Sequence, residues 1–149
     1  METTAKIGYG FIVSQEVLES GLKAAKLRKA AKETPPLKED LETYFENFDG
    51  EIVVDYPAEI VYQIAGEHPY FSEHLFYFRT GDLAGQDDEG AIAIVVGETL
   101  QYADTITSLQ PLVQPKKESL AMLEEFRKQF FKKSARIEPA SWVMGSSCS

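Results

Sequence analysis

The chain has 149 residues, 44% of them hydrophobic and 26% charged, and a formal net charge of −9. This composition indicates one folded domain of ordinary size and excludes wholesale disorder. The negative charge disfavours direct binding to the nucleic-acid backbone, which depends on lysine and arginine displacing counterions, and the longest apolar run, residues 91–96, is far shorter than the roughly 20 residues of a membrane helix.

Residues 6–14, KIGYGFIVS, carry alternating apolar side chains, which predicts a strand with one buried face. Ser14 can cap a following helix because its hydroxyl accepts a hydrogen bond from an otherwise unpaired amide of the first turn. Helical spacing of apolar residues continues to about Lys32, and the lysines there interact favourably with the negative end of the helix dipole. We therefore expect a strand and then one helix over residues 14–32.

Thr34, Pro35 and Pro36 end that helix and can begin another, because proline is tolerated in the first turn. Apolar residues then recur at spacings of three and four: Leu37, Leu41, Tyr44, Phe45 and Phe48. This pattern predicts an amphipathic helix that ends at Phe48, before the Asp-Gly pair at 49–50. A short strand over residues 51–56 is expected to follow.

Residues 57–69 fit two patterns, because Pro57 can open a helix while Ile60, Tyr62 and Ile64 alternate as in a strand. We favour the strand slightly. Residues 74–81 and 91–100 are clearer strands, and the polar segment 82–90 between them has the composition of a hairpin loop. An antiparallel pair of strands is therefore predicted.

The C-terminal part predicts an amphipathic helix over residues 116–133 and a last strand over residues 135–144. Pro139 places this strand at a sheet edge, since proline cannot donate to a central ladder. Strands that follow one another without helices between them indicate the α+β class. We expect a single α+β domain over residues 1–145, with a mostly antiparallel sheet packed with three amphipathic helices, and a flexible tail over residues 146–149.

The distribution of charge is more informative than its sum. Residues 39–114 contain sixteen acids and one base, Arg79, and so carry −15, which leaves +6 for the rest of the chain. Lysines of the first helix could face acids of the second across the Thr-Pro-Pro turn, but exposed pairs contribute only about 0 to 1 kcal/mol each. Around ten acids would stay uncompensated. The bases form two clusters: Lys23, Lys26, Arg28, Lys29 and Lys32, and Lys116, Lys117, Arg127, Lys128, Lys132, Lys133 and Arg136.

Three groups of residues suggest a ligand site, and each has a plainer interpretation. Gly8 and Gly10 lack the third glycine and the Lys-Ser/Thr pair of a phosphate loop, so a bulge or a close backbone crossing is favoured. The pairs at 67–68 and 73–74, each glutamate followed by histidine, offer metal-ligand chemistry but not the four ligands of a structural zinc site, so solvated or loop-anchoring histidines are favoured. The acids of residues 82–89 lack the spacing of a calcium loop and fit a polar hairpin tip.

No combination of residues identifies an enzyme. Cys148 is the single cysteine, so it cannot form an internal disulfide, and no neighbour activates it. No serine stands in a nucleophile elbow, G-x-S-x-G. We predict no cofactor and no metal. The lone cysteine and an N-terminus without a secretory pattern favour the cytoplasm of a bacterial or infected host cell.

The opening KIGYGFIVS, followed at once by an amphipathic helix, resembles small uncharacterised bacteriophage-encoded α+β proteins. The resemblance covers only this opening and the first helix, contains no diagnostic motif and transfers no functional site. Some such proteins act as inhibitors whose acidic surface occupies a groove that normally binds nucleic acid. The resemblance therefore implies an inhibitor or a nucleic-acid mimic.

Two functions follow from these patterns. The first is a non-enzymatic interaction protein whose acidic surface binds a basic protein partner, through Glu39, Asp40, Glu42, Glu46, Asp82, Asp87, Asp88 and Glu89. The alternative is a small-molecule or nucleotide-binding protein, or a small enzyme, with a pocket lined by tyrosines, namely Tyr56, Tyr62, Tyr70 and Tyr77. The last strand or an unpaired sheet edge could also support a homo-oligomer.

Overall fold

The computed structural model describes residues 3–39, 41–48, 51–54, 57–79, 83, 90–96 and 115–148. Its helices are α1 (Gln15–Ser20), α2 (Ala24–Lys32), α3 (Pro35–Lys38), α4 (Leu41–Tyr44), α5 (Pro57–Glu67) and α6 (Lys117–Phe130). Its strands are β1 (Thr3–Val13), β2 (Phe45–Phe48), β3 (Glu51–Val54), β4 (Leu75–Arg79), β5 (Ile92–Val96) and β6 (Ser141–Cys148).

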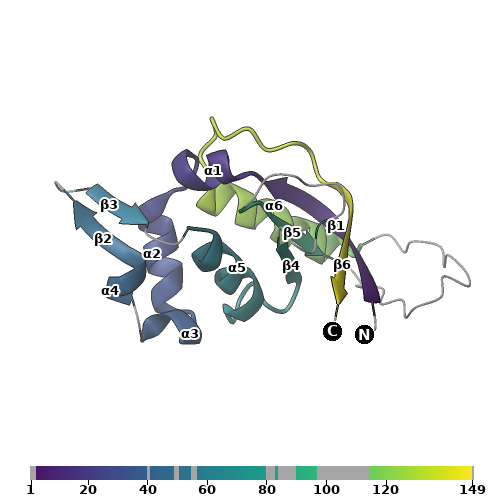
Figure 1. Cartoon of the computed structure of the whole chain (residues 1–149), viewed down its shortest axis with the longest axis horizontal. Coiled ribbons are helices and arrows are strands. Elements are labelled where there is room, and N and C mark those ends of the chain that lie inside the picture. Colours follow the sequence, from purple (N-terminus) through teal and green to yellow (C-terminus); the bar gives the residue numbers. More distant parts are fainter. Residues whose placement is uncertain are drawn as a thin grey trace, which may run out of the picture.

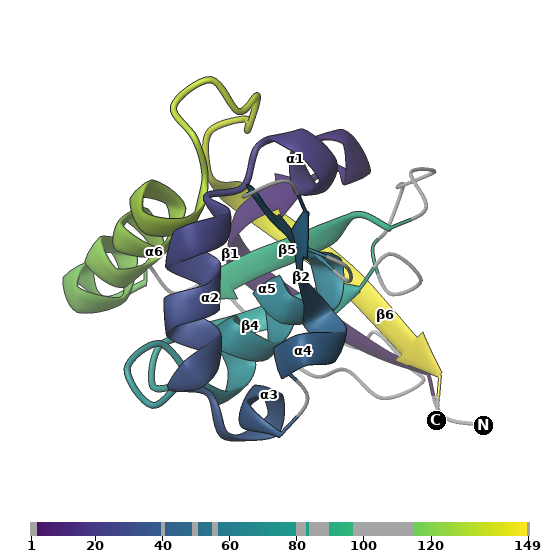
Figure 2. The same cartoon turned by 90° about the vertical axis from the view of Figure 1, so that its left-hand side faces the viewer.

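The α+β class is confirmed. The main sheet has four antiparallel strands in the order β4-β5-β1-β6, and the helices gather on one of its faces (Figures 1 and 2). The pair β2–β3 forms a separate two-stranded sheet at the end of the molecule away from β6 (Figure 1). The N- and C-terminal ends of the chain lie side by side, because β1 and β6 pair from Thr3 and Cys148 onward.

The core lies between the sheet and the helices. Every second side chain along the strands points into it. Phe11 and Val13 of β1 and Ile94 of β5 face the helical layer, where they are buried. The centre of this layer is a group of aromatic rings in which Phe126 and Phe130 of α6 pack edge-on against Phe71. Burial of such side chains is the main source of stability in the fold.

The opposite face of the sheet carries a smaller cluster, formed by Phe78, Leu83, Ala93, Val95 and Val143. Gly8 and Gly10 lie in β1 beneath it; Gly10 pairs with Val95 of β5 and Ser141 of β6, and Gly8 pairs with Val143 of β6. A Cβ atom on Gly10 would come within 1.8 Å of the Ile94 carbonyl oxygen, so only glycine permits this approach. Of the two predicted alternatives, a bulge or a close backbone crossing, the structure shows a close backbone approach at Gly10, whereas a Cβ atom on Gly8 would meet the Val95 side chain.

Several predicted elements agree with the structure. β4 and β5 form the expected antiparallel pair, and α6 lies within the expected helix. β6 is at a sheet edge as expected, but it begins at Ser141 rather than at residue 135, so Pro139 precedes the strand instead of interrupting it. The expected strand over residues 51–56 corresponds to β3. Residues 146–148, expected in a flexible tail, belong to β6, and Ser149 lies outside the described residues.

The first predicted helix is wrong in one respect, because it is broken at residues 21–23. The end of α6 docks there: the Lys23 amide donates to the Phe130 carbonyl, and the Lys132 amide donates to the Gly21 carbonyl. Leu22 and Phe131 form the bridge between these two bonds. Hydrogen bonds from a distant segment thus replace those of a continuous helix.

The second predicted helix, ending at Phe48, is also wrong. Two four-residue helices, α3 and α4, are followed by β2, which pairs with β3 in the register Phe45 to Val54 and Phe48 to Glu51. The intervening residues 49–50 are Asp-Gly, which favours a two-residue hairpin turn. The aromatic residues have helical spacing, but in the structure Phe45 and Phe48 lie in a strand that pairs with β3.

The slight preference for a strand over residues 57–69 is wrong as well, because α5 covers most of this segment. Pro57 occupies its first position, where the missing donor costs nothing. Ile60, Val61, Ile64 and Ala65 are all fully buried, which is the spacing of one helical face. Ile60 and Ile64 belong to this buried face, so their alternation with polar residues fits a helix as well as a strand.

The segment between β4 and β5 is more than a hairpin tip. Leu83 is buried and forms an antiparallel bridge with Gly145 of β6, at the opposite edge of the sheet from β4. Leu83 is an anchor inside the expected polar loop.

Candidate interaction surface

The predicted acidic residues do not share one helix. Glu39 follows α3 and is exposed. Glu42 lies in α4 and Glu46 in β2, and their side chains are outside the described part of the structure. The other predicted partner-binding residues, Asp40, Asp82, Asp87, Asp88 and Glu89, also lie outside the described residues.

Two buried residues, Thr34 and Leu37, fix the turn that precedes Glu39. Thr34 is fully buried, and its hydroxyl donates to the Ala30 carbonyl at 2.8 Å, which ties the turn to the last part of α2. Leu37 is buried beside it and fixes α3 against the core. A buried hydroxyl and a buried leucine thus place Glu39 at the surface.

The expected pairing of lysines in the first helix with acids of the second can be followed only at Glu39, which has no described base within 4.0 Å, because the side chains of Asp40, Glu42 and Glu46 lie outside the described part of the structure. The only contact in the described ranges between a basic group and a carboxylate within 4.0 Å joins His68 Nε2 to Glu33 Oε2, at 2.9 Å. The Tyr70 amide donates to His68 Nδ1 at 3.1 Å, so Nε2 carries the proton and donates to Glu33. His68 ties the turn after α5 to the end of α2.

The second histidine has a similar position. His74 Nδ1 lies 3.2 Å from the Ser119 hydroxyl, which joins the start of β4 to the first turns of α6. No group of three or more metal-ligating side chains occurs among the described residues. The contacts of His68 and His74 correspond to the loop-anchoring alternative, and His68 is buried rather than solvated.

The structure places three of the four tyrosines of the alternative pocket, and it separates them. The rings of Tyr62 and Tyr77 are stacked with centroids 4.7 Å apart, and the Arg79 guanidinium lies 4.5 Å from the Tyr62 centroid. Burial raises the pKa of Tyr62, an effect that the nearby Arg79 charge opposes. Tyr56 lies outside the described residues.

Tyr70 points to another part of the surface, where it is 50% exposed. Its hydroxyl donates to Glu125 Oε2 of α6 at 2.9 Å, and this hydrogen bond raises the pKa of Tyr70. Tyr62 and Tyr77 face each other while Tyr70 contacts α6, so these three rings do not line a common cavity. The sequence could not distinguish these positions because it left the path of residues 57–69 open.

A groove of about 650 Å³ between α2 and α6 was not predicted. It carries both signs of charge and is lined by Lys23, Lys26, Ala121, Glu124, Glu125, Lys128 and Gln129. At one end the Lys23 ammonium donates to the Lys128 carbonyl at 3.0 Å, close to the negative end of the α6 dipole. The lysines belong to both basic clusters of the sequence, which fold together here.

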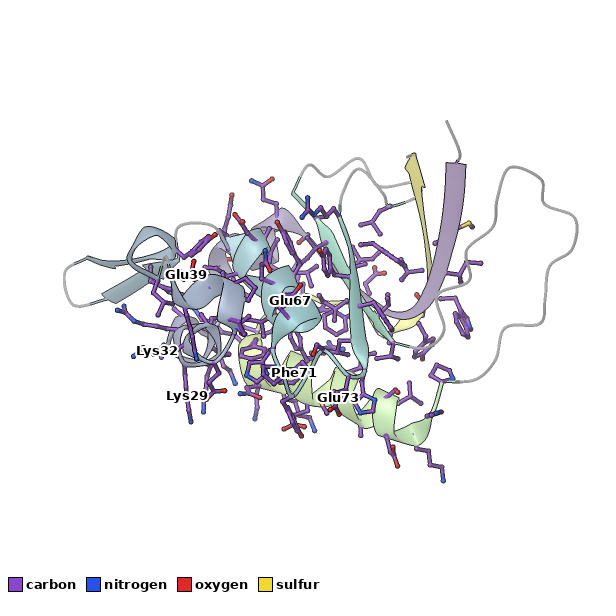
Figure 3. All side chains as sticks on the ribbon, turned by 90° about the horizontal axis from the view of Figure 1, so that it is seen from below. Lys29, Lys32, Glu39, Glu67, Phe71 and Glu73 are labelled. Carbon is purple, nitrogen blue, oxygen red and sulfur yellow. The ribbon has the colours of Figure 1, made fainter. Side chains whose placement is uncertain are left out.

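Exposed carboxylates are spread along one side of the molecule. Glu39, Glu67 and Glu73 are all exposed, and Figure 3 shows them along the side viewed from below, with Lys29 and Lys32 at its margin. Within the described residues, none of these three carboxylates has a basic partner within 4.0 Å. Carboxylates and lysines are therefore both exposed on this side, without ion pairs between them among the described residues.

Compared with models of protein families, with characterised proteins and with solved structures, the chain matches none. No helix in the described ranges has the length and apolar character needed to cross a membrane. The function therefore has to be inferred from the residues of the chain itself.

Proposed function

We propose that this is a non-enzymatic interaction protein that binds a basic protein partner through an acidic surface around Glu39. The observation that carries the proposal is the absence of ion pairs between lysine or arginine and carboxylates among the described residues, where the one pair is His68–Glu33. Of the acids in residues 39–114 whose side chains the structure describes, Glu39, Glu67 and Glu73 are exposed and have no described base within 4.0 Å.

Two physical properties support this proposal. Uncompensated charge of one sign attracts an oppositely charged surface over several ångströms and speeds association. Exposed aromatic side chains supply contact area that is stabilising when buried in a complex, and Tyr70 is 50% exposed on a turn fixed by His68 and Phe71. Charge would steer the encounter and an aromatic anchor would hold it.

The partner class follows from the same chemistry. A basic groove that normally receives nucleic-acid phosphates presents the lysine and arginine side chains that such a surface would satisfy. An acidic protein bound there would compete with nucleic acid. The proposed activity is therefore inhibition by occupation of the groove, with no covalent step.

The test begins with capture of partners from the native cell on the immobilised protein, followed by elution with increasing salt. Binding of the eluted partner is then measured with a variant that has lysine at four acidic positions: Glu39, Asp40, Glu42 and Glu46. A matched control has lysine at four acidic positions elsewhere: Glu19, Glu118, Glu124 and Glu138. Circular dichroism checks that both variants fold.

We expect the first variant to lose binding and the control to retain most of it, although the two carry the same net charge. Affinity should also fall steeply with salt, as binding that depends on surface charge does. Binding that is insensitive to salt, or an equal loss in both variants, contradicts the proposal.

A further inference from the structure

The groove between α2 and α6 lies between two helices that run in opposite directions. The start of α2 adjoins the end of α6, where the Lys23 amide donates to the Phe130 carbonyl. The turn that contacts the end of α2 through His68 also contacts α6, through the hydrogen bond from Tyr70 to Glu125. Figure 2 shows the two helices side by side. Every residue that lines the groove belongs to the described part of the chain.

Each helix contributes one continuous strip of side chains to the groove. Residues three, four and seven positions apart share one face of a helix. The lining residues have this spacing: Lys23 and Lys26 at the start of α2, and Ala121, Glu124, Glu125, Lys128 and Gln129 on α6. All of them are exposed or half-buried. A ligand can therefore reach the charged groups in a groove of about 650 Å³, a volume in the range of small-molecule sites.

One part of the groove favours an anion. The Lys23 ammonium donates to the Lys128 carbonyl at 3.0 Å and so covers the negative end of the α6 dipole. Lys23 is also the N-cap of α2 and makes no side-chain hydrogen bond to the first turn, so the positive end of the α2 dipole lies at the same place. Lys26 and Lys128 have no carboxylate within 4.0 Å among the described residues. These groups together present positive charge to a carboxylate.

The neighbouring part of the groove favours a cation. Glu124 and Glu125 lie one turn before Lys128 on α6 and are exposed. The Tyr70 hydroxyl donates to Glu125 Oε2 at 2.9 Å, which orients this carboxylate while Oε1 can still accept from a ligand. Neither glutamate has a lysine or arginine within 4.0 Å in the described ranges. The two carboxylates thus present negative charge to an ammonium group.

We propose that this groove binds a short peptide with free termini. The terminal carboxylate contacts Lys26 and Lys128. The terminal ammonium group contacts Glu124 and Glu125. A simple anion would meet the glutamates and a simple cation would meet the lysines, whereas a zwitterion matches both signs of charge. Gln129 adds an amide that can donate to a peptide group and accept from it.

The spacing of the charges sets the length of the peptide. Glu124 and Lys128 are four residues apart on α6, which is about 6 Å along the helix axis. Two residues of extended peptide span about 7 Å, so a dipeptide or tripeptide brings its termini to both groups. A single amino acid holds its two charges closer together than this. The proposal goes beyond the acidic-surface function, since Glu39 does not line the groove.

The first experiment measures binding of the tripeptide trialanine by isothermal titration calorimetry at low salt. The same peptide is compared after acetylation of its N-terminus, amidation of its C-terminus, or both. We expect free trialanine to bind with a Kd below about 1 mM and each cap to weaken binding at least about tenfold, because it removes one of the two matched charges. No binding of the free peptide up to about 10 mM, or equal affinity of a capped peptide, overturns the proposal.

The second experiment locates the peptide with single substitutions. Lys26→Ala and Glu124→Ala each remove one charged contact and should weaken trialanine binding at least about tenfold. Lys29→Ala is the matched control, since Lys29 is an exposed lysine of α2 that does not line the groove. Circular dichroism checks that each variant is folded. Wild-type affinity of Lys26→Ala or Glu124→Ala, or an equal loss in Lys29→Ala, shows that the peptide is not held in this groove.

Discussion

The aromatic group beneath the turn from α5 to β4 gives the sharpest test of the fold. Phe71 is only 1% exposed, and its ring centroid lies 5.1 Å from that of Phe126 and 5.5 Å from that of Phe130. The same ring lies 5.2 Å from His68 and 5.1 Å from Tyr70. Phe71 therefore joins the turn that carries these two residues to α6.

Phe71→Ala should remove both the buried ring and its edge-on contacts. Truncation of a buried phenylalanine costs about 3 to 5 kcal/mol, and each aromatic pair contributes about 0.5 to 1.5 kcal/mol. Because Phe71 has several such pairs, we expect a loss in the upper part of the first range, about 4 kcal/mol. Phe71→Leu keeps most of the volume and should cost about 1.5 kcal/mol.

The free energy of unfolding is measured by urea denaturation followed by far-ultraviolet circular dichroism. Thermal unfolding of Phe71→Ala should shift downward by about 8 to 16 °C, since 1 kcal/mol corresponds to about 2 to 4 °C in a chain of this size. Phe76→Ala, at 44% exposure and at the same low protein concentration, should cost much less. A loss below about 1 kcal/mol for Phe71→Ala, or one equal to that of Phe76→Ala, refutes the central role of this ring.

Three further predictions test other contacts. Gly10→Ala should prevent stable folding, because its Cβ would stand 1.8 Å from the Ile94 carbonyl oxygen; wild-type stability in urea would show that β1 and β5 are further apart. Thr34→Val should lower the free energy of unfolding by about 1 kcal/mol by removing the bond to the Ala30 carbonyl, and an unchanged unfolding midpoint contradicts this. Burial raises the pKa of Tyr62 above its usual value of 10.0, so the unfolded chain loses this proton first and stability should fall as the pH rises from about 10 through the folded pKa. Tyr62→Phe should flatten this fall in alkaline urea denaturation, and equal slopes for both proteins would contradict it.

The candidate surface was predictable only in part. The charge imbalance of residues 39–114 and the exposure of Glu39 follow from sequence and from the turn at Thr34, Pro35 and Pro36. The placement of the tyrosines does not, because α5 turns Tyr62 toward Tyr77 while Tyr70, beyond its end, contacts α6. Tyr62 and Tyr77 thus stack on each other, whereas Tyr70 forms a hydrogen bond with α6.

The sequence by itself determined the α+β class, the β4–β5 pair, α6 and the edge position of β6. The class, the strand pair and the helix depend on local patterns, alternation along a strand and spacing along a helix, that no distant contact overrides. The edge position of β6 agrees with the prediction, although Pro139 lies before the strand. The sequence also determined how much charge the chain carries and in which segments.

Only the tertiary structure decided the rest. The end of α6 breaks the first helix because its backbone groups pair with Gly21 and Lys23, and pairing with β3 turns an apparent helical segment into β2. Glu33 pairs with His68 across 35 positions of sequence, because the turn after α5 folds back onto the end of α2. Such choices depend on which segments meet in space, and a local pattern of residues does not contain that information.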